Sequence, residues 1–555
     1  MRARWYWTIP AVVILCLLAP VLLSDRTFST DWGNHYWLIY MQGLDISHLH
    51  EPSYYLQSTL GAFYPYYAFY GGTFYVVAGT ISSAISPDVA AAAVYLGALA
   101  ASYLGWTWLA KQAGVRGWRA QLPGAIAVTA PFAVTNLYGR GGIPEVVATA
   151  MLPLIAAAAI SLVREPRARL RDMAAFVVGI VFLTGTHTLS LVWGSCFLAL
   201  VTVLLVVCYW SALKDRVMRL VGLAWLGVLG ACINAWVLAP LILYHGRLME
   251  QDPDPISQGA YTNPGNLFSL FRNAGDPYVF PIKADINAAL PVLALLWALV
   301  CGAVFWRWLA PRSRALAAGL TTLLLALVVL ILNPGMIEKL PEALRFVQFP
   351  YRLVTYADLC IVGLVTLALA ALERTEERTR TRLATYALAA IAAFNLVLSV
   401  VQNQEVRSWL GGGRGEALSS AVQPPPTWYA TLQFADGSTP EVAPTLHRQL
   451  IVPVEEGIRD SYRVTYPPGP AGTVQTNIAT GSYLVDLRGA AAAGRGPAGQ
   501  MVVRLPASPD RPRVVEVSAE DGPAVTVARW ISLLSLLGAC AALVAFAAVR
   551  RRRGA

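Results

Sequence analysis

Long apolar runs alternate with short polar patches along the chain. The runs extend for about 18 to 22 residues, the length at which an α-helix crosses roughly 30 Å of hydrocarbon. The chain from Met173 to Leu213 has no charged residue and is too long for one crossing, so we predict a hairpin that turns near His187. Helices of spanning length are predicted at residues 6–24, 89–110, 120–136, 144–163, 173–187, 189–209, 220–240, 289–306, 315–333, 353–372, 383–400 and 526–549.

Basic residues gather at the ends of these runs and indicate which way each helix points. With the helices placed as above, every basic cluster falls on the same side of the membrane, as the positive-inside rule requires. Both termini are then cytoplasmic, and the first outward loop covers about residues 25–64. The clusters are Arg2/Arg4, Lys111/Arg116/Arg119, Arg164/Arg167/Arg169/Arg171, Lys214/Arg216/Arg219, Arg307/Arg312/Arg314, Arg374/Arg378/Arg380/Arg382 and Arg550 to Arg553.

Residues 63–82 are apolar but rich in Tyr, Gly and Pro, and they do not fit as a simple crossing. Counting them as a span would place Lys111, Arg116 and Arg119 outside, against the rule that orients the other helices. We therefore interpret this segment as a re-entrant or interfacial helix that is shielded by protein or by a water-filled cavity. A thirteenth span is the alternative.

A polar stretch, about residues 401–525, follows the eleventh predicted helix. It is rich in Pro and Gly and has alternating patches such as Ser461–Tyr466 and Met501–Leu505, which are typical of short strands. The fold class predicted is an all-α polytopic membrane protein with about 12 or 13 transmembrane helices and a small β-rich extracytoplasmic domain before the last helix. We divide the chain into a transmembrane domain at 1–400, the extracytoplasmic domain at 401–525, and a last helix with a basic tail at 526–555.

Composition agrees with a membrane protein. Hydrophobic residues make up 56% of the chain and charged residues 13%, with a mean hydropathy of +0.53, which is too little charge to cover a soluble protein of this length. The formal charge of +10 comes from clusters at helix ends, so we do not expect nucleic acid as a partner. All seven cysteines lie in apolar segments without a CxxC pair, so neither a disulfide framework nor a zinc site is expected.

Asp31 lies in the first outward loop, a few residues beyond the first predicted helix. It is either a solvated or helix-capping aspartate or a functional carboxylate. His48, His50 and Glu51 follow in the same loop, but two histidines and one acid at this spacing are a weak metal signal. We therefore assign no metal ligand.

The turn from Tyr138 to Glu145 places Arg140 and Glu145 between two hydrophobic helices, at or just inside the membrane surface. Charges at that depth are costly unless they are paired or functional. Two compatible hypotheses remain open: an Arg140–Glu145 ion pair that holds the turn, or an Arg140 that binds phosphate while Glu145 orients a hydroxyl group or a metal. His187, at the outward tip of the uncharged hairpin, is either a hydrogen-bonded structural residue or part of the same site.

Arg345, Gln348 and Arg352 open the tenth predicted helix from the outward side. The two arginines are seven residues apart, a spacing that suits the phosphate of a lipid lying along a helix, because guanidinium groups bind phosphate in a bidentate manner. The alternative is simple snorkelling toward lipid head groups. Arginines at outward helix ends oppose the topological bias, which favours a specific role.

The order of these motifs resembles a known superfamily. A first helix, an outward loop with Asp31, the Tyr-x-Arg-Gly turn with Glu145, a hairpin with His187 at its tip and the Arg-Phe-x-Gln-Phe-Pro-Tyr-Arg motif resemble the bacterial "6-pyruvoyl-tetrahydropterin synthase-related" polytopic membrane proteins and, more broadly, the GT-C glycosyltransferases. The resemblance covers roughly residues 1–400. The polar stretch behind it matches no family that we can name.

The resemblance implies a GT-C-type enzyme that takes a sugar from a polyprenyl-phosphate donor and passes it to a glycan, lipid or protein acceptor outside the cytoplasm. Asp31 occupies the position of the superfamily's catalytic acid in the first outward loop and would be the base. Arg140, Arg345 and Arg352 would bind the phosphate, with Glu145, His187 and Gln348 at the substrate. The superfamily's paired acid is not intact, because Trp32 and Gly33 follow Asp31, so a divalent cation is left open as the one cofactor.

The expected location is a bacterial inner membrane, with the site on the extracytoplasmic side among membrane lipids. Two rival functions remain open. A transporter or flippase of a lipid-linked or anionic substrate would use the same arginines to bind, although it should also carry ionisable residues near mid-membrane and matched halves, and no internal repeat is evident. A non-catalytic envelope-assembly subunit is the third hypothesis.

Overall fold

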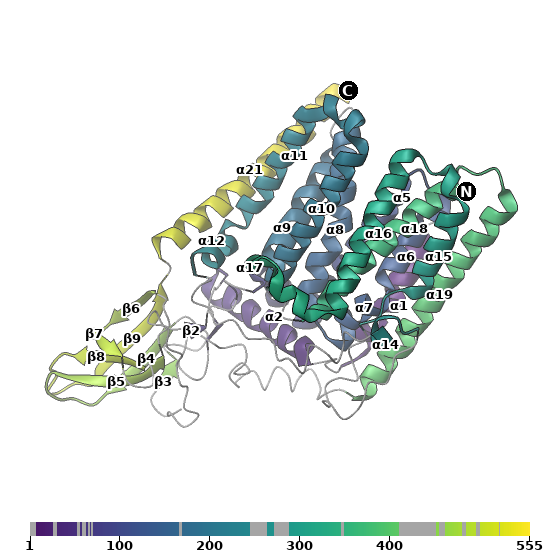
Figure 1. The fold of residues 1–555 in the computed structure, drawn as a ribbon. Helices are drawn as coiled ribbons and strands as arrows, with labels where there is room; N and C mark the ends of the chain where they lie inside the picture. The colour runs from purple at the N-terminus through teal and green to yellow at the C-terminus, as the bar shows by residue number, and fades with distance from the viewer. Residues whose placement is uncertain are drawn as a thin grey trace.

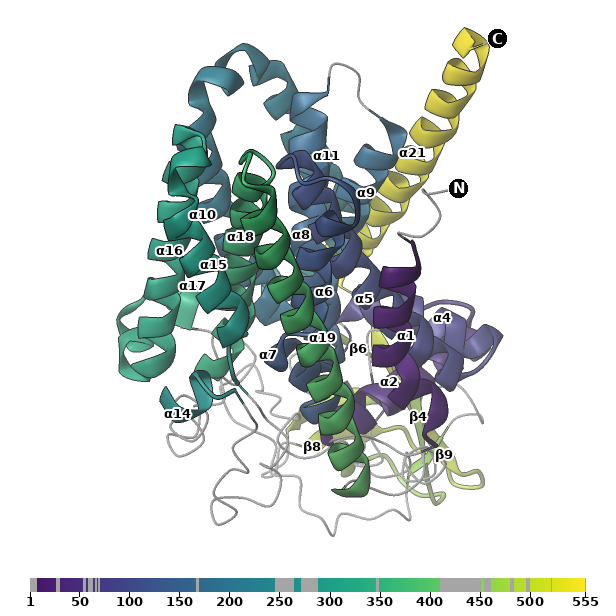
Figure 2. The same ribbon diagram turned by 90° about the vertical axis from the view of Figure 1, so that its right-hand side faces the viewer.

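The protein is a bundle of long helices with a small β region at one end (Figure 1). Figures 1 and 2 show the long helices side by side, with both chain termini at one end of the bundle and α2 and the β strands at the other. The computed structural model describes residues 7–25, 30–52, 56–57, 63–64, 67, 70–165, 169–244, 264–270, 288–345, 349–409, 451–453, 461–479, 484–495, 500–520 and 522–554.

The long helices coincide with the predicted spans. Seven segments of the described chain are long and apolar enough to cross a membrane, one of them Thr188–Ile233, and Thr8–Leu23 and Val292–Val304 are shorter apolar helices. The multi-pass prediction is therefore confirmed, whereas the count of 12 or 13 crossings stays a prediction. The helices at these positions are α1 (Thr8–Leu23), α5 (Pro87–Gln112), α8 (Ile143–Arg164), α9 (Leu170–Thr186), α10 (Thr188–Leu213), α11 (Val217–Ile233), α12 (Ala235–Tyr244), α15 (Val292–Val304), α16 (Pro311–Leu332), α18 (Val354–Leu372), α19 (Arg378–Trp409) and α21 (Pro523–Gly554).

The span predicted at 120–136 is not one continuous helix. It consists of the 3₁₀ turn η2 (Gly117–Gln121), α6 (Leu122–Val128), α7 (Pro131–Val134) and the π-helical turn η3 (Thr135–Gly139). Pro131 causes the break, because a proline lacks an N–H and forces the preceding residue out of the helical region. Ala130 accordingly has ψ 139°, an extended value.

Two helices that are not among the long apolar spans pack against each other. α2 (Thr30–Leu49) occupies half of the predicted first loop, and α4 (Gly72–Ala84) packs against it. With 13 residues, α4 is about 20 Å long, shorter than the hydrocarbon thickness. Length alone does not exclude a crossing, since α15 at a predicted span also has 13 residues, so the re-entrant or interfacial interpretation stays a prediction. The short strands β1 (Leu56–Gln57) and β2 (Phe63–Tyr64) pair between the two helices in the chain.

The polar stretch before the last helix contains two antiparallel sheets, which confirms a β-rich region at this place. One sheet has the order β3-β4-β9-β6 and the other β5-β8-β7. The predicted patches at 461–466 and 501–505 coincide with β4 and β8. α21 then packs against α11 and α12, on the outside of the bundle (Figure 2). The strands are β3 (Ile451–Pro453), β4 (Ser461–Tyr466), β5 (Gly472–Ala479), β6 (Leu484–Arg488), β7 (Ala491–Arg495), β8 (Gln500–Leu505) and β9 (Arg513–Glu520).

A buried asparagine ties α4 to α9 and α11. Asn234 is fully buried; its Oδ1 accepts a hydrogen bond from the Thr73 hydroxyl (2.6 Å), and its Nδ2 donates to the Val181 carbonyl (2.5 Å) and the Thr184 hydroxyl (2.7 Å). Gly185 allows this approach, since a Cβ atom there would lie 2.7 Å from Asn234 Nδ2. These contacts fix the position of the short helix α4 against α9 and the end of α11.

Replacing Asn234 with alanine leaves the buried Thr73 hydroxyl and Val181 carbonyl without these partners. We expect Asn234→Ala to lower the free energy of unfolding by about 1–2 kcal/mol, measured as the thermal midpoint of the purified protein in detergent. Asn395→Ala is the matched control, because the buried Asn395 Nδ2 has no hydrogen-bond partner in the described chain. Equal losses in the two variants would contradict the role of Asn234.

Candidate functional site

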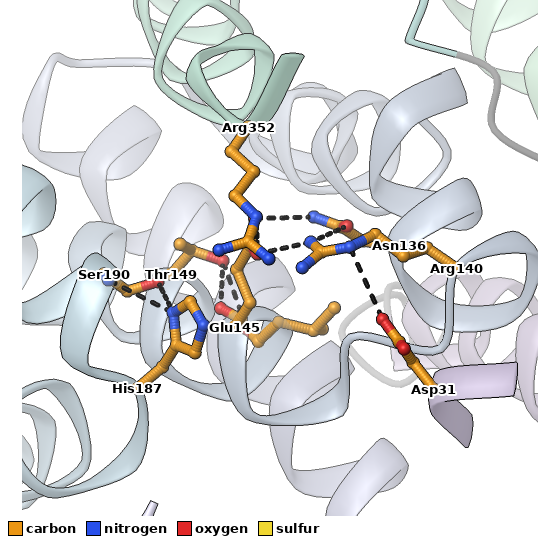
Figure 3. A network of polar contacts seen from close by, with 9 residues as sticks. Asp31, Asn136, Arg140, Glu145, Thr149, His187, Ser190 and Arg352 are labelled. Carbon is orange, nitrogen blue, oxygen red and sulfur yellow. Dashed lines mark hydrogen bonds and ion pairs between the residues drawn. The ribbon is translucent and has the colours of Figure 1, made fainter. Parts of the chain in front are cut away.

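Five of the residues selected from the sequence gather in one network of polar contacts (Figure 3). Asp31 lies in the first turn of α2 and Glu145 in the first turn of α8. Arg140 follows the π-helical turn η3, and His187 separates α9 from α10. Arg352 belongs to the 3₁₀ turn η9 (Pro350–Leu353), which leads into α18. The structure therefore brings together side chains that are far apart in sequence, from Asp31 to Arg352.

Arg140 is the centre of this group. Its side chain is 5% exposed; Nη1 pairs with Glu145 Oε2, and Nε lies 3.8 Å from Asp31 Oδ2. Nη1 also donates to Asn136 Oδ1 at 3.2 Å, while Asn136 Nδ2 donates to Glu145 Oε1 at 3.3 Å. A buried guanidinium needs both charge compensation and hydrogen-bond acceptors, and these three residues supply them.

The local backbone explains how Arg140 reaches its partners. The Arg140 N–H donates to the Thr135 carbonyl at 2.6 Å. This bond joins residues five positions apart, as in a π-helix, so the turn contains one residue more than an α-helical turn. Gly141 has φ +71°, a conformation that disfavours residues with a Cβ atom. A Cβ at Gly142 would lie 3.1 Å from Arg140 Nη1. The two glycines thus let the chain fold back over the guanidinium.

Arg352 approaches the same carboxylate from the other side. Its Nε lies 3.5 Å from Glu145 Oε2, and its side chain is 11% exposed. Each guanidinium also lies over an aromatic ring: Arg352 is 5.2 Å from the Phe349 ring centre and Arg140 is 5.8 Å from that of Tyr351, within cation–π range. Two carboxylates and two guanidiniums therefore balance in charge.

Of the two ring nitrogens of His187, Nδ1 accepts a hydrogen bond, and Nε2 has no hydrogen-bond partner in the described chain. The Ser190 backbone N–H donates to Nδ1 at 3.1 Å, so the lone pair is on Nδ1 and a neutral ring carries its proton on Nε2. Nε2 is buried without a hydrogen-bond partner in the described chain. The ring meets Tyr70 edge to face at 5.2 Å. Figure 3 shows the ring beside Glu145, so Nε2–H is a buried donor next to the charged group.

His35 was not among the candidates selected from the sequence. It lies four residues after Asp31 on α2, its Nδ1 is 2.6 Å from the Tyr75 hydroxyl, and its ring stacks on Tyr70 at 6.0 Å. Burial, and then the positive charge of Arg140, lowers the pKa of His35 to about 3, so the ring is neutral at physiological pH. The i, i+4 spacing from Asp31 was the available signal.

Asn136 was also missed, although its spacing offered a clue. It is a polar residue in an otherwise apolar run, four positions before Arg140. Its amide joins Arg140 to Glu145.

Two of the selected residues are not brought into this group. Arg345 is exposed at the end of the short helix α17 (Glu342–Arg345), where its Nε donates to the Leu340 carbonyl at 2.7 Å. The prediction that it shares a phosphate with Arg352 assumed one continuous helix, but α17 ends at Arg345 and α18 begins at Val354. Gln348 lies outside the described residues.

The acidic residues do not fit a divalent metal ion. Arg140 lies between Asp31 and Glu145 and pairs with both, so the two carboxylates do not face a common space. In the described part of the chain, no group of three or more His, Cys, Asp or Glu side chains could hold a metal ion. His50 and Glu51 are both exposed, and the side chain of His48 lies outside the described residues.

Because the folded state keeps His35 neutral down to about pH 3, the unfolded chain binds one more proton between about pH 6.5 and that value. Stability therefore falls as the pH is lowered through this window. We expect thermal midpoints between pH 7 and 4 to fall less steeply in His35→Gln than in wild type. His50→Gln, at an exposed histidine of the same segment, should keep the wild-type slope. Identical slopes in all three proteins would refute this effect.

Comparison with known proteins shows low similarity. No family model and no curated relative matches the chain. Among solved structures, the chain is similar to the arabinofuranosyltransferase AftD from Mycobacteria, with 16% identity and a TM-score of 0.43 over 74% of this chain and 27% of that one. It is also similar to the archaeal oligosaccharyltransferase AglB from Archaeoglobus fulgidus in complex with an inhibitory peptide and a dolichol-phosphate, with 14% identity and a TM-score of 0.38 over 77% of this chain and 60% of that one. The chain thus spans about a quarter of the length of the first protein and less than two thirds of the second.

Proposed function

We propose that the protein is a GT-C-type membrane glycosyltransferase that transfers a sugar from a polyprenyl-phosphate donor to a cell-envelope glycan, lipid or protein acceptor. One observation carries the proposal: a partly exposed carboxylate, Asp31, lies 3.8 Å from the buried guanidinium of Arg140, whose partner Glu145 also contacts Arg352. A base next to two phosphate-binding groups is what an inverting transfer from a lipid phosphate requires.

Asp31 is the proposed base because its side chain, at 26% exposed, is more accessible than that of Glu145, at 3%. In the proposed step the acceptor hydroxyl oxygen forms a bond to the anomeric carbon, and its proton passes to the Asp31 carboxylate. The bond between the anomeric carbon and the phosphate oxygen breaks with its electron pair. The polyprenyl phosphate leaves with the added negative charge next to the two guanidiniums.

Glu145 then has a positioning role. It accepts contacts from both Arg140 and Arg352, and it fixes the two guanidiniums before the substrate arrives, which lowers the reorganisation needed in the transition state. His187 offers its Nε2–H, and we assign it to an oxygen of the substrate. No step is assigned to a divalent cation, since Arg140 separates the carboxylates.

The proposed sidedness follows from the basic clusters and the arrangement of the bundle. α2, which carries Asp31, lies at the end away from the two termini (Figure 1). If the basic clusters are cytoplasmic, the site is extracytoplasmic, where lipid-linked sugars and envelope acceptors meet. We propose a bacterial inner membrane as its location, with 1–400 as the enzyme domain and 401–525 as a separate outward domain before the last helix and tail, 526–555.

Replacing Asp31 with asparagine keeps the side-chain shape and removes the base. We expect Asp31→Asn to lower transfer from radiolabelled polyprenyl-phosphate sugars by about 10²- to 10⁴-fold, with a thermal midpoint close to that of wild type. Asp88→Asn, at a carboxylate that accepts a hydrogen bond from Tyr36 away from this group, is the control. Wild-type rates in Asp31→Asn would exclude Asp31 as the base.

Arg352 and Arg345 form a matched pair of variants, since both lie just before α18 and only Arg352 contacts Glu145. We expect Arg352→Gln to reduce kcat/KM for the lipid donor by about tenfold or more, the loss of a hydrogen bond to a charged group. Arg345→Gln should stay near wild type. Equal losses would show that Arg345 also binds the donor.

A transporter or flippase of a lipid-linked or anionic substrate is the second candidate, and one observation favours it. Asp358 is a buried carboxyl group inside the span Pro350–Leu372, the kind of residue that marks ion pathways in membrane proteins. Movement of a labelled lipid-linked sugar across proteoliposomes, without transfer to any acceptor, would favour this function over the enzyme.

A further inference from the structure

Asp358 is a buried acid that the proposed reaction does not use. It lies in the second turn of α18 and is 7% exposed, and its Oδ1 has no hydrogen-bond partner in the described chain. Among the ion pairs of the described residues, none includes Asp358. An ionised carboxylate inside a membrane bundle is strongly unfavourable unless a positive charge compensates it.

The Asp358 side chain lines a cavity of about 70 Å³ between α5, α6, η3, α8 and α18. Most of its wall is Ala, Leu and Val, and the other polar positions are Ser102, Asn136, Thr149 and Thr355. A cavity of this volume has room for a small ion together with waters.

A proline in α8, outside the cavity lining, leaves the carbonyl of one lining residue without its usual helical donor. Pro153 lies inside α8 and has no N–H, so it cannot donate to the Thr149 carbonyl one turn earlier. Thr149 lines the cavity, as do the hydroxyl-bearing residues Ser102 and Thr355. Carboxylate, carbonyl and hydroxyl oxygens are hard ligands that suit alkali and alkaline-earth cations, and interrupted helices supply such carbonyls at ion sites in membranes.

The charge of the surroundings selects between these cations. Asp31 and Glu145 are balanced by Arg140 and Arg352 in the neighbouring group, which leaves the single negative charge of Asp358. A monovalent cation brings the total to zero, whereas a divalent cation would leave one positive charge in an apolar environment.

We propose that this cavity is a binding site for one alkali-metal cation, with Asp358 as its single charged ligand and neutral oxygens of Ser102, Thr149 and Thr355 completing the shell. The site adjoins the charged group of Figure 3, and cation binding there does not depend on which proposed function holds. Asn136 contributes to both, because it lines the cavity and its amide bonds to Arg140 and Glu145.

The test is the thermal midpoint of the full-length protein in detergent at fixed pH and ionic strength, with sodium or potassium chloride replacing choline chloride. A ligand that binds only the folded state raises stability with the logarithm of its concentration above Kd. We expect the wild-type midpoint to rise by several degrees, with the logarithm of the concentration, for at least one of the two cations. Asp358→Asn, which keeps the shape and removes the charge, should lose this rise.

Thr366→Val is the matched control, because Thr366 lies on the same helix and its hydroxyl donates to the Val362 carbonyl within that helix. It should respond to the cations as wild type does. Direct binding of ²²Na⁺ to wild type and Asp358→Asn gives a second readout that does not depend on folding stability. A wild-type midpoint that is equal in sodium, potassium and choline, with no ²²Na⁺ bound, would overturn the proposal. The charge of the Asp358 carboxylate would then be neutralised by a proton. An equal rise in Asp358→Asn would also overturn it.

Discussion

A guanidinium buried at the end of a membrane bundle is the constraint on which this part of the structure depends. Arg140 is 6% exposed, and a cation at that depth is stable only if acceptors and opposite charges surround it. The partners of Arg140 come from three elements. Asp31 lies in the first turn of α2, Asn136 in the π-helical turn η3 and Glu145 in the first turn of α8. Arg352, just before α18, is a second cation, and the Glu145 carboxylate forms ion pairs with both Arg140 and Arg352.

Much of the fold could be predicted because membrane spans obey local rules. The length of the apolar runs located the helices, and the basic clusters placed Asp31, Arg140, Glu145, His187 and Arg352 on one face before any contact was known. The assumption of an unbroken helix through residues 345–352 was wrong, whereas binding of the donor by Arg345 stays a prediction. The turn η9 begins at Pro350 instead, and Arg345 caps the preceding loop.

The remaining features depend on packing between distant segments, which hydropathy does not encode. Asp358 lies in a run that is apolar enough to count as a span, so its charge was overlooked, and only the structure shows the cavity beside it. His35 is neutral because Tyr70, Tyr75 and Arg140 surround it, and no property of residues 30–40 alone indicates this. The break at Pro131 was visible in the sequence, yet the apolar run around it resembled one helix.

Asn136 makes the charged group and the Asp358 cavity neighbours that share a side chain. An occupant of the cavity that moves the Asn136 amide also alters the acceptor of Arg140 and the donor to Glu145. Binding at either place then changes the affinity at the other by the same factor, since linkage between two equilibria is reciprocal. A substitution at Asn136 would therefore remove this link together with one acceptor of Arg140 and one donor to Glu145.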